Sequence, residues 1–418
     1  MERLRVLAVA DPASIHATRF VRLLQDIDCH VRMFHCETHY RIEEHLADTS
    51  VYVDTPGLPP QRGNRLLLAT PLRMPYGRAI APIGLLNHYA QGALRVGTRR
   101  LRGDESPFGA PHVPRAAELA HVIGDWRPDA VFSLRMQNEG YTVAAAKVRL
   151  GGKLGAPWVH YCWGTDIELF GKDPRFSPAH LPALREALAG CDFLIADSKR
   201  DLRQAPAFGF HGEALGDIVA TGGFDLARLR QIRRGAPAER DVILVKGREG
   251  DLVGRSVNVL RALQRVPAVK RFRICVVMAS RRMRAAVADE FQGLGCEVLP
   301  RLPYDDLLAL FARSRVAVSA SEVDGTPGFL VEAMAMGALP VHSDMESVRD
   351  WIAHGENGLL FPVDDVDALA RCLERGLADD ALAAHAGEAI WATAEIRLDR
   401  ARIREQMRGI VGRLRAAR

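Results

Sequence analysis

The sequence lacks the cysteine arrangement of a disulfide framework or a zinc site. Its 418 residues include seven cysteines, which are dispersed and form no Cys-x-x-Cys pair. An odd, scattered set of this kind is typical of a reducing compartment. The sequence therefore predicts a cytoplasmic location, with neither disulfides nor a metal site.

Long apolar runs are also missing. No window of about 18 residues is apolar and free of charge, so no membrane-spanning helix is expected. The apolar run within residues 1–10 is too short for a cleaved signal sequence and is typical of a buried first strand. A chain of this length exceeds one ordinary core, which predicts two domains.

Lysine is scarce, and arginine carries almost all of the positive charge. Lysine occurs only at positions 147, 153, 172, 199, 246 and 270, and the net charge is +5. This mild excess is far from that of nucleic-acid-binding domains, so no nucleic-acid partner is expected. We attribute the arginine bias mainly to genomic base composition; a second interpretation is that arginine suits phosphate clamps.

Strand and helix patterns alternate along both halves of the chain. Apolar runs predict strands at 5–10, 29–34, 130–134, 158–162 and 191–198, and again at 242–245, 272–278, 296–299 and 316–319. This alternation predicts an α/β protein with two Rossmann-like halves. No Gly-x-Gly-x-x-Gly follows the first strand, which disfavours a dinucleotide-dependent dehydrogenase.

The most informative pattern lies within residues 321–340. Two acids, Asp324 and Glu332, flank a Gly-Thr-Pro-Gly turn that leads into an Ala/Met-rich helix. The unpaired N–H groups and the dipole at such a helix start favour an anion such as phosphate, and the carboxylates can accept hydrogen bonds from hydroxyls. A sugar nucleotide carries both groups. An ordinary strand–turn–helix unit has the same spacing, so both interpretations stay open at this point.

The text of residues 324–341, D-G-T-P-G-F-L-V-E-A-M-A-M-G-A-L-P-V, resembles the signature of the family 4 retaining glycosyltransferases (glycosyl transferases group 1). The downstream stretch G-E-N-G-L-L-F-P at 355–362 is similar to the continuation of that signature. The clearest departure is Asp324, which stands where the family usually has glutamate and is one methylene shorter.

The resemblance implies a GT-B fold, in which two Rossmann-like domains face each other across a cleft and the last helix crosses back to the first domain. We predict an acceptor-binding domain at 1–228, a linker at 229–240, a donor-binding domain at 241–395 and an amphipathic crossover helix at 396–418. In the last segment, Ile403, Met407, Ile410 and Leu414 recur at helical spacing.

The resemblance also implies the donor site. A UDP- or GDP-linked sugar would lie on the second half, with Glu332 on the ribose hydroxyls and Asp324 on the sugar, and no cofactor or metal would be needed. The other expected contacts are the backbone of Gly325, Thr326, Gly328 and Phe329, the cations Lys246, Arg248 and Arg255 on the diphosphate, and Arg301 and Leu302 beside the base. Cations there would offset the charge that develops as the diphosphate leaves.

Two residues of the first half are candidates by the same resemblance. Family members often carry His-Gly-x-Asp after the strand at 158–162; here Trp163 takes the histidine position, whereas Gly164 and Asp166 match. A helix cap is an equally open interpretation of Asp166. His16 follows the first strand, where donor phosphate and acceptor approach each other in the family; a loop histidine without a catalytic role is the simpler interpretation.

The implied function is retaining transfer of a hexosyl group to a glycan, lipid-linked or small-molecule acceptor. The leaving phosphate is expected to take the acceptor proton. A sugar-nucleotide epimerase of the same fold and a non-catalytic sugar-nucleotide-binding subunit are the alternatives. Residues 80–101 mix apolar residues with arginine. We interpret them as a solvated helix with a core face. The alternatives are an insertion of the first domain near the acceptor and a patch for peripheral contact with anionic lipid at the inner face of the membrane.

Overall fold

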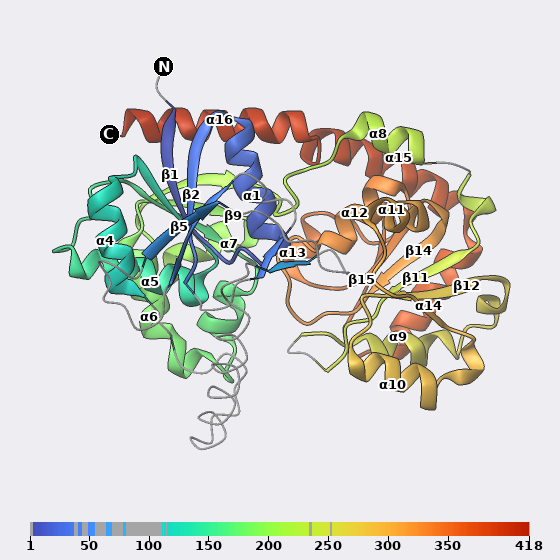
Figure 1. Cartoon of the computed structure of the whole chain (residues 1–418). Helices are drawn as coiled ribbons and strands as arrows, with labels where there is room; N and C mark the ends of the chain where they lie inside the picture. Colours follow the sequence, from blue (N-terminus) through green and yellow to red (C-terminus); the bar gives the residue numbers. More distant parts are fainter. Residues whose placement is uncertain are drawn as a thin grey trace. The chain divides into compact units, whose positions relative to one another are not determined.

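The structure, a computed structural model, describes residues 3–36, 41–43, 49–54, 64–68, 78–80, 111, 113, 115–233, 236–250 and 253–417. The chain forms two compact units, Met1–Gly222 with Arg404–Arg418, and Gly223–Ile403. Each unit contains a largely parallel sheet with helices packed on it, which confirms the predicted α/β class (Figure 1). The predicted basic segment 80–101 lies, apart from Ile80, outside the described residues.

The first unit is built on an eight-stranded sheet with the order β10-β9-β8-β7-β1-β2-β4-β5. Its strands are β1 (Leu4–Val9), β2 (Cys29–Phe34), β4 (Ser50–Asp54), β5 (Asn64–Leu68), β7 (Ala130–Leu134), β8 (Trp158–Cys162), β9 (Phe193–Ala196) and β10 (Glu213–Asp217). A separate antiparallel pair joins β3 (Arg41–Glu43) to β6 (Arg78–Ile80). Because β1 lies between β2 and β7, the strand order reverses there, and ligand sites of such sheets form at the carboxyl ends of the strands at this point.

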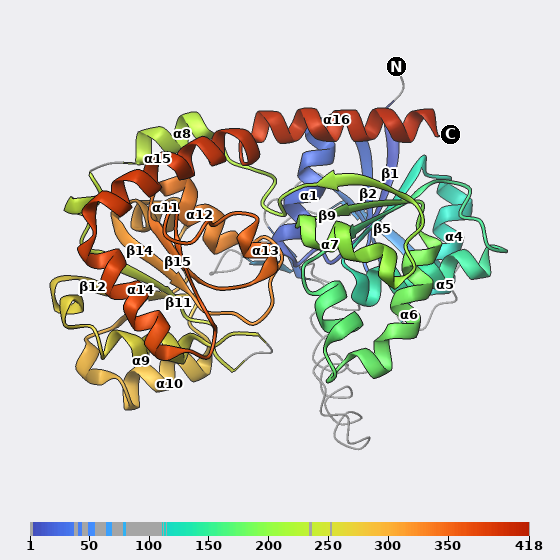
Figure 2. The same ribbon diagram turned by 180° about the vertical axis from the view of Figure 1, so that it is seen from behind.

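The helices of the first unit include a long C-terminal one. They are α1 (Ile15–Asp26), α4 (Ala116–Trp126), α5 (Tyr141–Arg149), α6 (Ser177–Gly190), α7 (Lys199–Gln204) and α16 (Arg400–Ala416), with short turns at η2 (Met136–Gly140), η3 (Glu168–Lys172) and η4 (Ala205–Phe208). Helix α16 buries its four predicted apolar positions. Its Arg404 pairs with Asp26 of α1, and Gln406 donates to the Asp217 carbonyl of β10. Figure 2 shows α16 running past the end of α1.

The helix expected from residue 396 is divided in the structure. Helix α15 (Asp380–Arg397) ends before Leu398, and α16 starts at Arg400. The Phe224 N–H donates to the Leu398 carbonyl at 2.7 Å, and the Arg400 N–H donates to the Phe224 carbonyl at 2.9 Å. This strand-like pairing interrupts the helix. It requires glycine at position 223, where a Cβ would lie 2.8 Å from the Leu398 carbonyl oxygen.

The second unit has a six-stranded parallel sheet with the order β13-β12-β11-β14-β15-β16. Its strands are β11 (Val242–Lys246), β12 (Arg273–Val277), β13 (Glu297–Val298), β14 (Ser314–Ser319), β15 (Leu339–Ser343) and β16 (Leu359–Phe361). Numbered along this unit, the order reads 3-2-1-4-5-6, as in Rossmann sheets. The strand order reverses between β11 and β14, so their carboxyl ends mark the expected ligand site.

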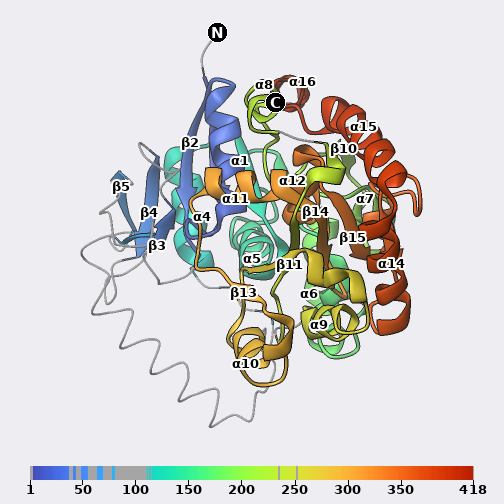
Figure 3. The ribbon, with the colours of Figure 1, turned by 90° about the vertical axis from the view of Figure 1, so that its right-hand side faces the viewer.

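Helices cover both faces of the second sheet (Figure 3). They are α8 (Leu226–Ile232), α9 (Ser256–Leu263), α10 (Arg281–Asp289), α11 (Tyr304–Arg313), α12 (Gly328–Met336), α13 (Glu346–Arg349), α14 (Val366–Ala378) and α15, with turns at η5 (Pro237–Glu239), η6 (Pro267–Arg271) and η7 (Gln292–Leu294). Helices α11 and α12 pack against each other, and so do α9 and α14. Residues 229–240, expected to be a linker, belong to this unit and include the end of α8 and η5.

Local chemistry explains the central elements. Strand β11 reads Val-Ile-Leu-Val, and all four side chains are buried because helices cover both faces of a parallel sheet. Helix α12 ends at Gly337, whose φ of +71° is left-handed and would strain any residue with a Cβ.

Among the described residues, no helix combines the length and the apolar character needed to cross a bilayer.

Candidate functional site

A row of polar residues lies at the carboxyl ends of the central strands of the second unit. Val245 of β11 pairs with Val318 of β14, so the next residues, Lys246 and Ser319, stand side by side. Ser319 pairs in turn with His342 of β15. Ser319 and His342 are buried, whereas the Lys246 side chain is 14% exposed. Lys246, a predicted diphosphate contact, thus ends its strand where the strand order reverses.

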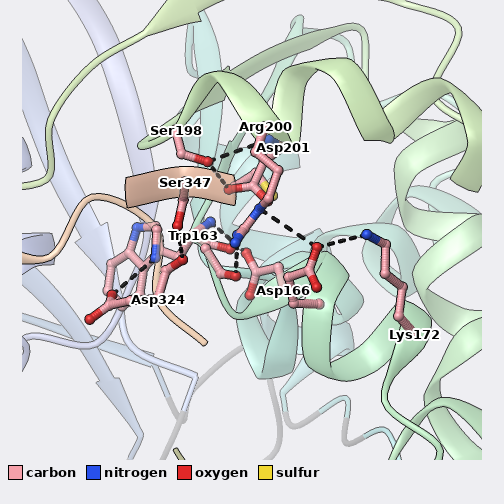
Figure 4. A network of polar contacts seen from close by, with 12 residues as sticks. Trp163, Asp166, Lys172, Ser198, Arg200, Asp201, Asp324 and Ser347 are labelled. Atoms are coloured by element: carbon pink, nitrogen blue, oxygen red, sulfur yellow. Dashed lines mark hydrogen bonds and ion pairs between the residues drawn. The ribbon is translucent and has the colours of Figure 1, made fainter. Parts of the chain in front are cut away.

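Asp324 lies beside this row. Its Oδ2 atom is 3.5 Å from Lys246 Nζ, and its Oδ1 atom accepts the Gly325 N–H at 3.0 Å. Ser347 donates its hydroxyl to the Asp324 carbonyl at 2.8 Å (Figure 4). These contacts fix the backbone and the carboxylate, and the 31% exposure of the side chain leaves the carboxylate within reach of a ligand.

The start of α12 offers backbone donors. Among the described residues, none accepts a hydrogen bond from the N–H of Gly328 or Phe329. The Gly325 N–H, expected to contact the sugar, is instead taken by Asp324, and the Thr326 hydroxyl accepts the Trp351 indole N–H at 3.2 Å. The helix dipole adds to the donors at this end, so the turn favours an anion or an oxygen-rich ligand.

Glu332 lies one turn into α12. It is four residues from Gly328 and therefore shares a face with the helix start, toward which helical side chains lean. The residue is only 6% exposed, and Phe329–Met336 of the same helix are all buried. A carboxylate this buried requires polar partners.

The two predicted arginines differ in their surroundings. Arg255 forms a tight ion pair with Glu322 and donates to the Gly254 carbonyl at 2.9 Å. Arg248 is exposed.

The first turn of α9 is closed by Glu249, whose Oε2 accepts the Val257 N–H at 2.8 Å. The sequence analysis did not single out Glu249 or Glu322, although each lies within a loop that it had selected.

His342 is a further polar group that the sequence analysis missed. Its Nδ1 lies 3.0 Å from the Ser343 carbonyl and donates to it. Burial, and then the charge of Lys246, lower the pKa of His342 to about 4. The hydrogen bond to Ser343 and the charge of Asp324 raise this pKa, but by less. The ring is therefore neutral at physiological pH. The available signal was a histidine inside an otherwise apolar strand.

Arg301 and Leu302, expected beside the base, precede α11. Arg301 is exposed and Leu302 is half-buried.

In the first unit, His16 and Trp163 lie together. His16 belongs to the first turn of α1, and its ring meets the edge of the Trp163 ring with centroids 5.9 Å apart and an interplanar angle of 78°. Asp166 is 1% exposed, and its Oδ2 accepts the Trp163 N–H at 2.8 Å. The Asp166 carboxylate thus closes the turn 163–166 by accepting from a residue before it, whereas an N-cap would accept from residues that follow it.

A buried ion-pair network supports this turn (Figure 4). Arg200, 3% exposed, donates to the Gly164 carbonyl at 2.6 Å and to Asp201 at 2.8 Å. The Ser198 hydroxyl donates to the other Asp201 oxygen at 2.7 Å. Buried charges need such partners, and loss of one partner leaves the other charge unbalanced.

The segment after β7 was also missed. Arg135 and Asn138 have φ values of 80° and 67°, which are strained for residues with a Cβ, and such strain is frequent at functional sites. Arg135 binds the fully buried Glu139 with two hydrogen bonds, of 2.6 and 3.1 Å. The polar run R-M-Q-N-E-G after a buried strand was the signal in the sequence.

Within the described part of the chain, His160, Cys162 and Asp166 form a group with metal-ligand chemistry. Their ligand atoms lie within 4.8 Å of one another, and all three residues are buried. Burial, and then the charges of Asp201, Asp166 and Asp197, raise the pKa of the Cys162 thiol, so the thiolate that a metal requires is disfavoured. The group therefore fits a metal poorly.

Comparisons with known proteins agree with this architecture. Residues 243–379 match the family model of glycosyl transferases group 1. A stretch of 55 residues is 49% identical to a phosphatidyl-myo-inositol mannosyltransferase of Mycolicibacterium smegmatis, and this match spans 13% of the chain and 14% of that enzyme.

Similar solved structures cover almost the whole chain. Sucrose-phosphate synthase of Thermosynechococcus elongatus superimposes with a TM-score of 0.68 at 16% identity over 100% of both chains. Anabaena HepE in complex with UDP-glucose gives 0.66 at 14% identity, over 98% of this chain and 100% of its own. A UDP-forming trehalose-phosphate synthase of Burkholderia xenovorans gives 0.64 at 13%, over 99% of both.

The fold is that of the GT-B glycosyltransferases. Residues 243–379 of the second unit are similar to glycosyl transferases group 1, and this match agrees with the resemblance seen in the motif at 324–341.

Proposed function

We propose that the chain is a retaining glycosyltransferase that moves a sugar from a nucleoside-diphosphate donor to a glycan, lipid-linked or small-molecule acceptor. One observation carries this proposal: Lys246 lies 3.5 Å from Asp324 where the strand order reverses, within a domain that matches glycosyl transferases group 1. A cation, a carboxylate and a helix start whose first N–H groups have no acceptor among the described residues suit a ligand that combines a diphosphate with hydroxyls.

Each group has a role in the proposed reaction. Lys246, with Arg248 and Arg255 nearby in sequence, offsets the charge that builds on the diphosphate as the glycosidic bond stretches. Asp324 and the first N–H groups of α12 orient the transferred sugar, and Glu332 accepts hydrogen bonds from the ribose hydroxyls. The departing phosphate takes the acceptor proton on the same face of the sugar, so no protein nucleophile and no metal take part.

The relatives narrow the choice of donor. HepE was solved with UDP-glucose, and the Burkholderia synthase is described as UDP-forming, so UDP-glucose is the first donor to test. Because one relative is a mannosyltransferase, a nucleotide-linked mannose is the second donor to test.

The protein would act in the cytoplasm, and a lipid-linked acceptor would place it at the inner face of an anionic membrane.

A donor panel tests the proposal. UDP- and GDP-linked sugars are added singly to the protein with EDTA, and the melting temperature is recorded, since a ligand that binds only the folded state raises it. A stabilising donor is then supplied with candidate acceptors, and nucleotide release and the anomeric configuration of the product are measured. Stabilisation by no sugar nucleotide would overturn the proposal.

The same panel separates the alternatives. An epimerase converts a sugar nucleotide without any acceptor. A non-catalytic subunit binds the donor tightly and transfers nothing.

A further inference from the structure

A hydrogen-bonded chain crosses the core of the first unit from β7 to the turn after β8. The Trp158 indole N–H donates to Ser133 Oγ at 2.8 Å, and Ser133 Oγ lies 2.9 Å from His160 Nδ1. On the other side of the ring, His160 Nε2 lies 3.7 Å from Asp166 Oδ2. The first three residues are fully buried, and Asp166 is 1% exposed.

These contacts determine the tautomer of His160. An indole N–H can only donate, so Ser133 Oγ accepts from Trp158 and retains its own proton for another acceptor. Within the described part of the chain, the only remaining partner of Ser133 Oγ is His160 Nδ1. The Ser133 hydroxyl therefore donates to Nδ1, and the ring proton is on Nε2.

The Nε2 proton lies toward the Asp166 carboxylate. His160 Nε2 is buried and makes no hydrogen bond within the described structure at its present separation of 3.7 Å from Asp166. A shift of well under 1 Å would bring the two atoms to hydrogen-bonding distance. A carboxylate that already accepts the Trp163 N–H would then be held by a second donor.

We propose that His160 is a positioning residue that acts through Asp166: its Nε2–H holds the carboxylate, the carboxylate holds the backbone of Trp163, and the Trp163 ring sets the orientation of His16. The last two contacts are the 2.8 Å hydrogen bond and the edge-to-face ring contact described above. The consequence for turnover rests on the proposed glycosyl transfer, whereas the tautomer and the coupling to Asp166 do not.

The same series of hydrogen bonds argues against a metal ion between His160, Cys162 and Asp166. A metal bound at Nε2 would move the ring proton to Nδ1, where metal-bound histidines usually donate to a neighbour. Ser133 Oγ would then accept twice, and its own proton would lose its acceptor inside the core. A buried hydroxyl without an acceptor is costly, so the protonated Nε2 is favoured.

A matched pair of variants tests the proposal. A glutamine amide reaches the place of Nε2 and an asparagine amide that of Nδ1, so His160→Gln keeps a donor toward Asp166 and His160→Asn does not. We expect His160→Asn to lower kcat about tenfold and His160→Gln to keep it within about threefold. In an Asp166→Ala background, His160→Asn should have little further effect, which a merely structural role for His160 would not produce.

Two readouts do not depend on turnover. Nitrogen-15 NMR of the wild-type imidazole should show a proton on Nε2 and a hydrogen-bonded acceptor at Nδ1. Urea unfolding of His160→Asn, of Asp166→Ala and of the variant with both substitutions should show the same coupling energy between the two residues as the kinetic measurements.

The outcomes are distinguishable. A proton on Nδ1, additive effects of the two substitutions, or stoichiometric zinc that purifies with the wild type and is lost in His160→Asn would each overturn the proposal. If the wild type transfers no sugar, the proposed function fails, and the NMR and unfolding cycles still decide the role of His160.

Discussion

The ammonium of Lys246 lies 3.5 Å from the carboxylate of Asp324. Lys246 ends β11 and Asp324 follows β14, the two strands between which the strand order of the second sheet reverses. Their side chains are 14% and 31% exposed, so the pair is screened by solvent and adds at most about 1 kcal/mol to stability. We infer that the pair is held ready for a ligand, with the donor diphosphate as the stronger partner for Lys246.

Removal of the Lys246 charge should therefore affect donor use far more than folding. We expect Lys246→Met to lower kcat/KM for the donor about 100-fold, because an uncompensated charge develops on the leaving diphosphate, and to change the free energy of unfolding by no more than about 1 kcal/mol. Lys270→Met, at an exposed lysine of η6, is the matched control. Equal kinetics for the two variants would remove Lys246 from the site.

Arg255 should influence transfer more than stability. Arg255→Ala should reduce kcat/KM at least about tenfold through the lost diphosphate contact, with a loss of about 1 kcal/mol in stability from the broken pair with Glu322. Steady-state kinetics and urea unfolding measure the two effects. The control is Glu322→Gln, which removes the pair but keeps the cation and should leave kcat/KM unchanged. If Arg255→Ala has wild-type kinetics, its role is confined to the loop.

Glu332 should recognise the donor ribose. Glu332→Ala should weaken donor binding by at least a few kcal/mol, because a hydroxyl pair desolvated against this buried residue would lose its acceptor. Calorimetric titration with the ribose nucleotide and its 2′-deoxy analogue supplies the control. The wild type should prefer the ribose form, and the variant should bind both forms equally weakly. An unchanged ribose preference in the variant would contradict the assignment.

His342 should make the protein less stable in acid. Its pKa is lowered from 6.5 to about 4 in the folded state, chiefly by burial. Between these pH values the unfolded state therefore binds a proton at His342 and the folded state does not. Stability is therefore lost as pH falls from 6.5 to 4, by about 3 kcal/mol in total, and this contribution is constant below pH 4. Urea unfolding at a series of pH values measures the slope.

The His342→Gln variant is the control for that slope. Glutamine does not titrate, so the decline between pH 6.5 and 4 should be smaller by the His342 contribution. An identical decline in both proteins would show that other groups cause it.

Local patterns were sufficient for much of the architecture. The strands at 29–34, 130–134 and 158–162 have the predicted bounds, because buried parallel strands read as continuous apolar runs between turn residues. The carboxylate-flanked turn at 324–332 was visible because its parts are neighbours in sequence. The buried face of α16 followed from a spacing of three and four residues.

Contacts between distant residues were decided only by the tertiary structure. The row of Lys246, Ser319 and His342 depends on the register of three strands, which no local pattern encodes. The backbone pairing of Phe224 with residues near Asp399 divides a segment that has uninterrupted helical spacing. Sequence alone thus determined many of the strands and helices and the candidate donor turn. The folded chain decided which buried polar groups meet, because only long-range packing brings them within reach of one another.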